Sequence, residues 1–260
     1  MYSQILLDTH CHLYDESFHS DIDEMIQRGL DAGVYKMLLP NIDKDSIAPM
    51  ISLSDRYPDH CFPMMGLHPC YVKDDYREHL VILEQWLGQK TFIGIGEIGL
   101  DYYWDKTFKE QQLDAFRIQL KWALEKELPV SIHSRESFHD CLDIVREIGN
   151  GRIKGVFHCF GGTARQARDV MDIGMFIGIG GVVTYKKSDL GSVLKEIGLK
   201  NVVLETDAPY LPPVPYRGKR NESSYLTFIA EKIAEEVGIS FADVATITSE
   251  NASKVFITTV

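Results

Sequence analysis

The residues with the clearest capacity for chemistry are two histidines at the end of a short apolar run near the amino terminus. His10 and His12 follow residues 5–7 and stand two positions apart. Side chains alternate between the two faces of a strand, so both imidazoles would point the same way and could bind one metal ion with little backbone distortion. Two histidines near a strand end are also common as plain surface residues, so this pair alone does not establish a metal site.

Further residues that can bind metal stand just past the ends of other short apolar runs. They are His68, Glu97, Asp101, His133, His158 and Asp207. The carboxyl ends of parallel strands meet at one end of a barrel, where barrel enzymes keep their active sites. Each of these residues taken singly is equally well explained as a polar loop residue, but their shared placement predicts a metal site. Mixed nitrogen and oxygen ligands suit Zn, Mn, Fe or Co, and tolerate Mg where carboxylates dominate.

The number of these candidate ligands favours two metal ions over one. Five strong candidates accompany Glu97, which follows the fourth predicted strand together with Asp101. Two divalent cations ~3.5–4 Å apart can share a bridging carboxylate and a bridging hydroxide, an arrangement that cleaves phosphate esters and amides. The nucleophile is then water.

Strands and helices in alternation must position these residues. Apolar runs rich in β-branched residues predict strands near residues 5–7, 36–39, 62–65, 92–95, 130–132, 154–157, 175–179 and 202–204. The intervals are close to the ~30 residues of one strand and its crossover, and the chain of 260 residues matches the ~250 of a (β/α)8 barrel. No linker or composition shift cuts the chain. We therefore predict an α/β fold, a single-domain (β/α)8 TIM barrel over residues 1–260.

Apolar residues at helical spacing predict helices between these strands. The stripes are Phe18, Ile22 and Ile26; Leu113, Phe116, Leu120 and Leu124; and Leu226, Ile229, Ile233 and Val237. Ser240 and Asp243 predict the N-cap of a last helix that runs toward Phe256. The sequence has no phosphate-binding loop or dinucleotide fingerprint, because the glycines of residues 94–99 fall within a strand and do not open a helix.

Composition and charge restrict the class of protein. The net charge of -11 argues against a protein that coats DNA or binds anionic membranes, since both need a broad basic surface. An enzyme that handles phosphates in a locally basic, metal-filled cleft remains compatible with it. The five cysteines include no Cys-x-x-Cys pair, which predicts reduced thiols. No basic signal region or apolar stretch of ~20 residues is present, so we expect a soluble, cytoplasmic protein.

Several motifs resemble those of the TatD family of metal-dependent deoxyribonucleases. They are Asp8-Thr-His-Cys-His12, Gly66-Leu-His-Pro69, Gly96-Glu-Ile-Gly-Leu-Asp-Tyr102, Ile132-His-Ser-Arg-Glu136, His158-Cys-Phe-Gly-Gly162, and Glu205-Thr-Asp-Ala-Pro-Tyr-Leu211 followed by Pro215-Tyr-Arg-Gly-Lys-Arg-Asn-Glu222. The resemblance spans nearly the whole chain, and its last motif is long enough to be specific. It implies a (β/α)8 barrel of the amidohydrolase-like superfamily and hydrolysis of DNA phosphodiesters at a divalent metal centre.

The resemblance also implies a role for each matched residue. It assigns His10, His12 and Asp207 to one metal ion, His133 and His158 to the second, Glu97 to a bridge between them, and His68 to a position beside the site. The family often has a proline after the Asn-Glu of the last motif, where this chain has Ser223. That departure affects only the expected shape of the local loop.

Basic and aromatic residues near the strand ends suggest how a substrate would be held. The basic set is Arg135, Lys186, Lys187, Arg217, Lys219 and Arg220, and the aromatic set is Tyr102, Tyr103, Trp104, Tyr210 and Tyr216. Arg217 and Lys219 are the stronger candidates, because they stand in a loop just after Asp207 and a guanidinium can bind two phosphate oxygens. Solvated loop charge explains the two adjacent lysines and Arg220 equally well. The rings could stack on bases, although loop packing accounts for about half of them.

Together these features predict a hydrolase that cleaves DNA phosphodiester bonds, exonucleolytically on single strands, with two divalent metal ions (Zn, Mn or Mg) and a metal-bound hydroxide. The catalytic candidates are Asp207 and Glu97, and the substrate-binding candidates are Arg217, Lys219, Arg135 and His68. We expect nucleic acid, single-stranded DNA in particular, as the substrate, and neither a membrane nor an obligate protein partner.

Two alternatives remain open from the sequence. The same metal pair would polarise a carbonyl, so the enzyme could hydrolyse a carboxylic ester or amide such as an aminoacyl bond on tRNA. A carbamylated-lysine centre is less favoured, because Glu97 stands where the bridging lysine would be needed. A non-catalytic barrel that only binds would be expected to have lost one or more ligands, and none of the matched ligands is missing from the sequence.

Overall fold

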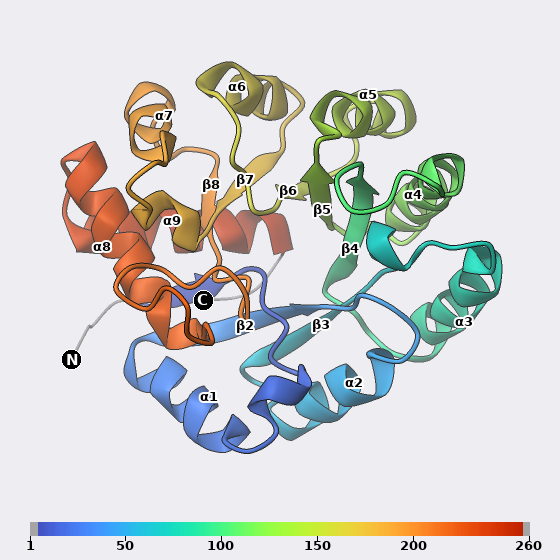
Figure 1. Ribbon diagram of the computed structural model, residues 1–260, viewed down its shortest axis with the longest axis horizontal. Coiled ribbons are helices and arrows are strands. Elements are labelled where there is room, and N and C mark those ends of the chain that lie inside the picture. Colours follow the sequence, from blue (N-terminus) through green and yellow to red (C-terminus); the bar gives the residue numbers. More distant parts are fainter. Residues whose placement is uncertain (1–4, 257–260) are drawn as a thin grey trace.

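In the computed structural model, which describes residues 5–256, parallel strands form a ring that helices surround (Figure 1). The strands are β1 (Leu6–Asp8), β2 (Val34–Pro40), β3 (Cys61–Met65), β4 (Gly94–Asp101), β5 (Val130–Arg135), β6 (Gly155–Phe157), β7 (Phe176–Ile179) and β8 (Val202–Leu204). Each strand pairs with the next in sequence order. The backbone N–H of Thr9 donates to the carbonyl of Leu204 (3.0 Å), which brings the end of β1 beside β8. The predicted (β/α)8 barrel is confirmed.

Helices follow the strands and cover the outside of the ring (Figure 1). They are α1 (Ile22–Asp31), α2 (Ile47–Arg56), α3 (Tyr76–Gln89), α4 (Lys109–Glu125), α5 (Phe138–Gly149), α6 (Ala164–Asp172), α7 (Leu190–Ile197), α8 (Leu226–Val237) and α9 (Phe241–Phe256), with 3-10 turns η1 (Glu16–Phe18), η2 (Pro69–Tyr71), η3 (Gly181–Thr184) and η4 (Ser223–Tyr225). Leu226, Ile229 and Ile233 of α8 are fully buried, as their spacing predicts. None of the helices within residues 5–256 is long and apolar enough to cross a membrane.

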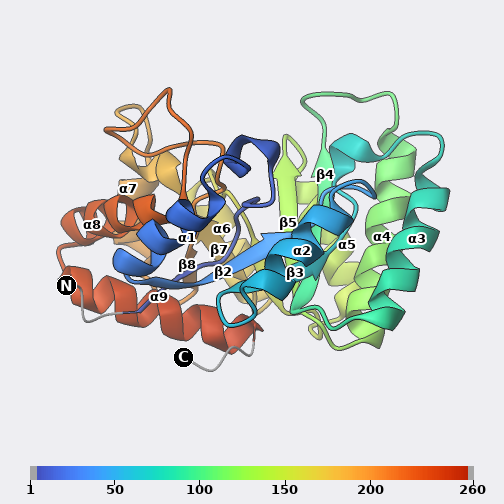
Figure 2. The ribbon, with the colours of Figure 1, turned by 90° about the horizontal axis from the view of Figure 1, so that it is seen from below.

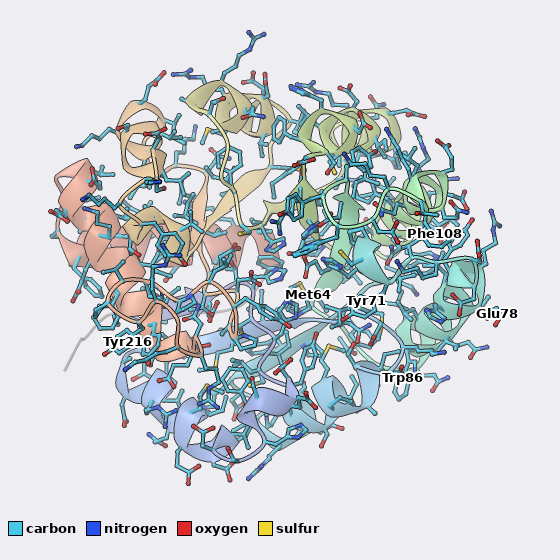
Figure 3. All side chains as sticks on the ribbon, viewed as in Figure 1. Met64, Tyr71, Glu78, Trp86, Phe108 and Tyr216 are labelled. Carbon is cyan, nitrogen blue, oxygen red and sulfur yellow. The ribbon has the colours of Figure 1, made fainter. Side chains whose placement is uncertain are left out.

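The last helix, α9, closes the amino-terminal end of the barrel (Figure 2). Its residues Ala252, Val255 and Phe256 pack with Leu7, Leu38, Met64, Val156 and Val203, which come from five strands. Figure 3 shows Met64 near the middle of the ring. Ser240 caps the helix as predicted, because its hydroxyl accepts a hydrogen bond from the N–H of Asp243 (3.0 Å). Because α9 fills the amino-terminal end of the barrel, a ligand-binding site within the barrel can form only at the carboxyl ends of the strands.

Two strands are longer than the sequence predicts. β4 extends to Asp101 and β5 to Arg135, so Glu97, Asp101 and His133 lie within strands and not just past them. The reason is the glycine pattern of β4, since Gly99 faces His133 so closely that a side chain there would collide with the His133 carbonyl. The two backbones therefore stay paired beyond the apolar residues that mark the strand in the sequence.

The position of Phe18 also differs from the prediction. The apolar spacing predicts Phe18 in the same helix as Ile22, but Phe18 lies in η1, and α1 begins only at Ile22. The carboxylate of Asp15 accepts a hydrogen bond from the N–H of Ser17 (2.9 Å) and starts the separate turn. Phe18 is fully buried, so the pattern identified a core residue correctly and its element wrongly.

Candidate metal centre

Side chains of the types that bind metal converge at the carboxyl end of the barrel. Three groups have donor atoms within 4.8 Å of one another: His10, His12 and Glu97; His10, His158 and Asp207; and His68, Glu97 and His133. The residues that the sequence predicts as metal ligands are thus brought together, and their role as ligands stays a prediction. His68 lies in the group with Glu97 and His133.

Glu97 is the residue that joins the two halves of the cluster. Its Oε2 lies 3.2 Å from Nε2 of His10 and 3.4 Å from Nε2 of His12. Its Oε1 lies 2.7 Å from Nε2 of His158, 2.9 Å from Nδ1 of His133 and 3.2 Å from Nε2 of His68. Each carboxylate oxygen therefore faces a different set of imidazoles. Asp207 joins the first set, with Oδ1 3.6 Å from Nε2 of His12.

The first two histidines are oriented by hydrogen bonds on their outward nitrogens. Nδ1 of His10 lies 2.9 Å from the hydroxyl of Ser131, and Nδ1 of His12 lies 3.0 Å from the hydroxyl of Tyr14. The Tyr14 hydroxyl donates to the carbonyl of Pro40 (2.5 Å), so it accepts a hydrogen bond from Nδ1 of His12. That bond puts the proton on Nδ1 and leaves Nε2 available to a cation, as is usual for metal-binding histidines.

His133 is turned the other way. Its Nε2 lies 2.8 Å from Oδ2 of Asp101, which leaves Nδ1 directed at Glu97. Burial alone would raise the pKa of Asp101, but the hydrogen bond to His133 and two backbone N–H donors lower it to about 2. A carboxylate that stays ionised holds the proton of His133 on Nε2, so Nδ1 is the nitrogen offered to a cation.

The electrostatics of the cluster favour a bound cation. Burial alone would raise the pKa of Glu97, but the imidazoles of His68, His158 and His10 hold it well below its usual value. Burial alone would lower the pKa of His12, but hydrogen bonds to Asp207 and Glu97 raise it to about 9. Carboxylates that raise the pKa of a buried histidine create negative potential, which also attracts divalent cations.

The donor set therefore fits divalent metal ions. Imidazole nitrogens and carboxylate oxygens converge in a buried site, and hydrogen bonds on the outer side orient the rings of His10, His12 and His133. Such a mixed set suits Zn or Mn and admits Mg.

Comparison with known proteins identifies the family of the chain. The family model described as TatD related DNase matches residues 7–257. The chain belongs to the TatD family. This result confirms the resemblance that the motifs indicate. The family membership also places the chain among metal-dependent hydrolases.

Individual TatD-family relatives cover nearly the whole chain. YabD of Bacillus subtilis strain 168, an uncharacterized metal-dependent hydrolase, is 37% identical over 253 residues, which are 97% of this chain and 99% of the relative. The 3'-5' ssDNA/RNA exonuclease TatD of Erwinia tasmaniensis is 31% identical over 96% of this chain and 99% of its own. The crystal structure of YJJV, a TatD homolog from Escherichia coli K12, has a TM-score of 0.92 at 29% identity and covers 98% of each chain.

A buried aspartate fixes the segment that carries Asp207 in this TatD-family chain. Asp8 accepts hydrogen bonds from the N–H and the hydroxyl of Thr206 (2.9 and 2.6 Å) and from the hydroxyl of Ser223 (2.7 Å). Burial raises the pKa of Asp8 to about 6. Sequence reasoning missed this role, although a charged residue that ends a buried apolar run signals that it has partners.

The outward partners of the histidines were also missed. Sequence reasoning named Asp101 only as a metal-capable residue and did not consider Tyr14, Ser131 or Glu205. Glu205 is fully buried, with Oε1 3.6 Å from Nδ1 of His158 and 2.5 Å from the backbone N–H of Cys159 that donates to it. A buried carboxylate needs such a hydrogen-bond donor. In the sequence, the position of Glu205 in the Glu-Thr-Asp motif is the signal that could have identified this residue.

The candidate substrate-binding residues are separated by the structure. Arg135 lines a cavity together with His158. Arg217 is exposed and stacks on Tyr185, with its Cζ 4.2 Å from the ring centre. Lys219 is exposed and lies 5.9 Å from the ring centre of Tyr216. Both stay candidates for phosphate binding. Arg220 has a structural role, because it forms an ion pair with Asp21 (2.7 Å).

The aromatic residues divide in the same way. Tyr102 is buried and donates its hydroxyl to Asp140 (2.7 Å), and Tyr216 stacks on Tyr225 with ring centres 4.0 Å apart. These two rings are loop packing. Tyr103, Trp104 and Tyr210 are exposed at 50%, 67% and 52%. The rings of Tyr103, Trp104 and Tyr210 are therefore the ones available to a ligand.

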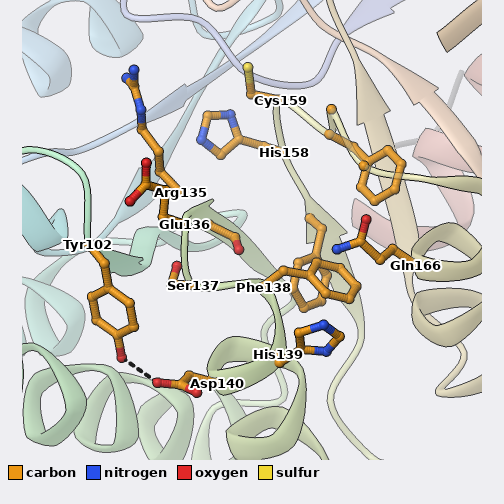
Figure 4. Close-up of a pocket in the computed structure, with 15 residues that line it drawn as sticks. Tyr102, Arg135, Glu136, Ser137, Phe138, His139, Asp140, His158, Cys159 and Gln166 are labelled. Atoms are coloured by element: carbon orange, nitrogen blue, oxygen red, sulfur yellow. Dashed lines mark hydrogen bonds between the residues drawn. The ribbon is translucent and has the colours of Figure 1, made fainter. Parts of the chain in front are cut away.

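A cavity of about 560 Å³ opens beside the metal centre, between the segments that follow β5 and β6 (Figure 4). His158 and Cys159 form one side of it, and Arg135, Ser137 and Phe138 form another. This volume lies within the ~300–1,000 Å³ typical of small-molecule sites. Because His158 belongs both to the cavity and to the cluster, a ligand in the cavity would reach the metal centre.

Proposed function

We propose that this protein hydrolyses phosphodiester bonds of single-stranded DNA from a strand end, using two divalent cations. The observation that carries this proposal is that the two carboxylate oxygens of Glu97 contact different histidines. Oε2 faces His10 and His12, and Oε1 faces His133 and His158. A carboxylate shared in this way is the feature that a two-metal hydrolase requires.

The chain offers one ligand set on each side of Glu97. His10, His12 and Asp207 would hold one cation, and His133 and His158, whose Nδ1 and Nε2 lie 3.5 Å apart, would hold the other. His68 lies with His133 and could join the second set, and His158 also lies near His10 and Asp207. When bound, two divalent cations supply Lewis acidity, which lowers the pKa of water and neutralises charge on phosphate oxygens.

Asp207 is suited to position the attacking water. Its side chain is 14% exposed, whereas that of Glu97 is 4% exposed, so Asp207 is the carboxylate closer to the solvent side of the cluster. Burial alone would raise the pKa of Asp207, but the hydrogen bond to His12 lowers it. An ionised Asp207 can accept a hydrogen from water at a carboxylate oxygen and orient the lone pair toward phosphorus.

The preference for an end or a short single strand follows from the charge of the chain. The net charge of -11 disfavours a long electrostatic track along a duplex, so only a few phosphates would be held at once. The name of the Erwinia tasmaniensis relative, a 3'-5' ssDNA/RNA exonuclease, supports this preference. Arg135, beside His158, and Arg217 are the cations proposed to hold phosphates.

The test is a substrate panel with protein purified without chelator. Metal analysis is followed by assays on end-labelled single-stranded DNA, RNA, duplex DNA and an aminoacyl-tRNA. We expect stepwise shortening of single-stranded DNA, with RNA as the second substrate.

Two variants, assayed on the same substrates, test the role of Asp207. Asp207→Asn should lower kcat on DNA by about 100-fold or more, the usual effect of removing a proton acceptor. Glu147→Gln, which removes the same charge from an exposed site on α5, should leave kcat unchanged. Rapid cleavage of the aminoacyl ester without any cleavage of DNA would replace the proposal with an ester hydrolase.

A further inference from the structure

Two adjacent aromatic rings stand exposed next to the metal centre. Tyr103 and Trp104 lie two and three residues past the end of β4, with ring centres 4.9 Å apart and ring planes at 85°. Trp104 is 67% exposed, whereas Tyr102, one position before the pair, is 8% exposed. The turn therefore buries one of its aromatic residues and presents two to solvent, which is unusual for rings of this size.

A guanidinium completes this surface. The Cζ of Arg135 lies 4.0 Å from the ring centre of Tyr103 and 5.2 Å from that of Trp104. Within residues 5–256, no carboxylate forms an ion pair with Arg135. Stacking fixes the plane of the guanidinium and leaves its N–H donors available to a ligand. We name Tyr103, Trp104 and Arg135 the aromatic rim.

The rim is held at a fixed position relative to the metal centre by one carboxylate. Oδ1 of Asp101 accepts the backbone N–H groups of Tyr103 and Trp104 (2.9 and 3.0 Å). Oδ2 of the same carboxylate lies 2.8 Å from Nε2 of His133. The residue that orients a candidate metal ligand thus also orients the exposed turn, so a ligand on the rim is aligned with the cluster.

Arg135 links the rim to the cavity. It belongs to the rim by its contacts with the rings, and it lines the cavity that contains His158 (Figure 4). A ligand that spans both features must offer a planar apolar group to the rings and an anion to the guanidinium. A nucleotide has both, because its base is planar and its phosphate is charged.

We propose that the aromatic rim stacks one unpaired base of the substrate while Arg135 binds the adjacent phosphate, and that the rim thereby selects single strands over duplexes. A base within a duplex has both faces covered by its neighbours, so only an unpaired base can stack on Trp104 or Tyr103. This inference rests on the proposed nuclease function and adds the group that the enzyme recognises.

The first test compares two oligonucleotides of equal length and charge, oligothymidylate and an oligonucleotide whose terminal residues are abasic. Stacking of a base on an aromatic side chain contributes about 5- to 150-fold to affinity. With the metal-loaded enzyme, Trp104→Ala should raise KM for oligothymidylate by that factor and leave KM for the abasic strand unchanged. Arg135→Ala should raise KM for both, because both carry the phosphate.

Two further variants separate stacking from a structural role. Trp104→Phe keeps a ring and should retain the wild-type KM. Tyr35→Ala removes an aromatic side chain that is 44% exposed at the start of β2, and it should change neither KM. Equal effects of Trp104→Ala on the two oligonucleotides, or no effect on either, would overturn the inference.

Tryptophan fluorescence gives a readout that does not depend on cleavage. The chain has three tryptophans, and Trp104 is far more exposed than Trp122 at 5%. Stopped-flow mixing with oligothymidylate should quench fluorescence within the binding phase, the abasic strand should not, and Trp104→Phe should abolish the quench while KM stays unchanged.

The two readouts distinguish the inference from the proposed function. DNA cleavage without base-dependent quenching and without a change of KM in Trp104→Ala would overturn the rim alone. Base-dependent quenching in an enzyme that cleaves no nucleic acid would support the rim and overturn the nuclease. Absence of both would overturn both.

Discussion

Replacing Glu97 with glutamine tests the architecture of the metal centre most directly. The substitution keeps the shape of the side chain and removes its charge. Because Glu97 is only 3% exposed, its carboxylate contacts the residues of the cluster and not solvent. One of its oxygens faces His10 and His12, and the other faces His133 and His158. If Glu97 bridges two cations, the loss of its charge must weaken both.

The expected size follows from the strength of contacts with a charged group. Such a contact contributes about 1.5–3 kcal/mol. At ~1.4 kcal/mol per factor of ten, each of the two dissociation constants should rise by roughly 10- to 150-fold. In contrast, His158→Ala should weaken chiefly the site of His133, because Nε2 of His158 lies 2.7 Å from Oε1 of Glu97 and 3.5 Å from Nδ1 of His133. A smaller effect on the other site is expected, since His158 also lies near His10 and Asp207.

The assay is equilibrium dialysis against buffered Zn²⁺, with metal measured by elemental analysis. Glu147→Gln is the matched control, because it removes one negative charge from a side chain that is 62% exposed on the outside of the barrel. Its two dissociation constants should equal those of the wild type. A Glu97→Gln protein that loses one ion and keeps the other at full affinity would refute the bridge.

Other consequences of the cluster and the fold can be measured separately. Because neighbouring carboxylates raise the pKa of His12 to about 9, metal binding at pH 7 should release protons, which calorimetry in buffers of different ionisation enthalpy will detect. At limiting metal, activity should fall as the pH drops below about 9, because protons then compete with metal for His12, and added metal should restore it; a profile that stays flat from about pH 9 to about pH 5 would contradict histidine ligation. Asp101→Asn should weaken metal binding by about 10- to 100-fold in a chelator competition, because it removes the acceptor that orients His133. Arg220 holds the pKa of Asp21 at about 2, so the stability due to this pair is present above the unfolded pKa of ~3.9 and is lost as pH falls toward 2; Asp21→Asn should flatten acid unfolding in that range.

The sequence was sufficient to predict the fold and the clustering of the site residues. The barrel brings the ends of parallel strands together, which is enough to predict the cluster. His10 and His12 lie just past β1 and not in it, but their Nε2 atoms are 3.3 Å apart, so the two rings converge as the spacing predicts. These inferences rest on local periodicity and on one topological rule. They did not need the partner of any side chain to be known.

Features that depend on long-range contacts could not be predicted. Arg220 belongs to the same loop as Arg217 and was a candidate for phosphate binding, but its partner Asp21 lies 199 positions away. The hydrogen bond between His133 and Asp101 joins two strands whose register is set by the close approach at Gly99. Neither the pairing nor the register leaves a periodic trace in the sequence, so both required the structure.

The pKa shifts explain how buried carboxylates are tolerated at the end of the barrel. Hydrogen bonds that His12 donates to Asp207 and Glu97 raise its pKa to about 9, and Glu97 raises the pKa of His158 well above its usual value. Protonated imidazoles therefore balance Glu97 and Asp207 when no cation is bound, and a buried ion pair of this kind avoids the large penalty of an uncompensated charge. Bound cations would displace the protons of His12 and His158, so the affinity of the cluster for metal should fall as the pH falls.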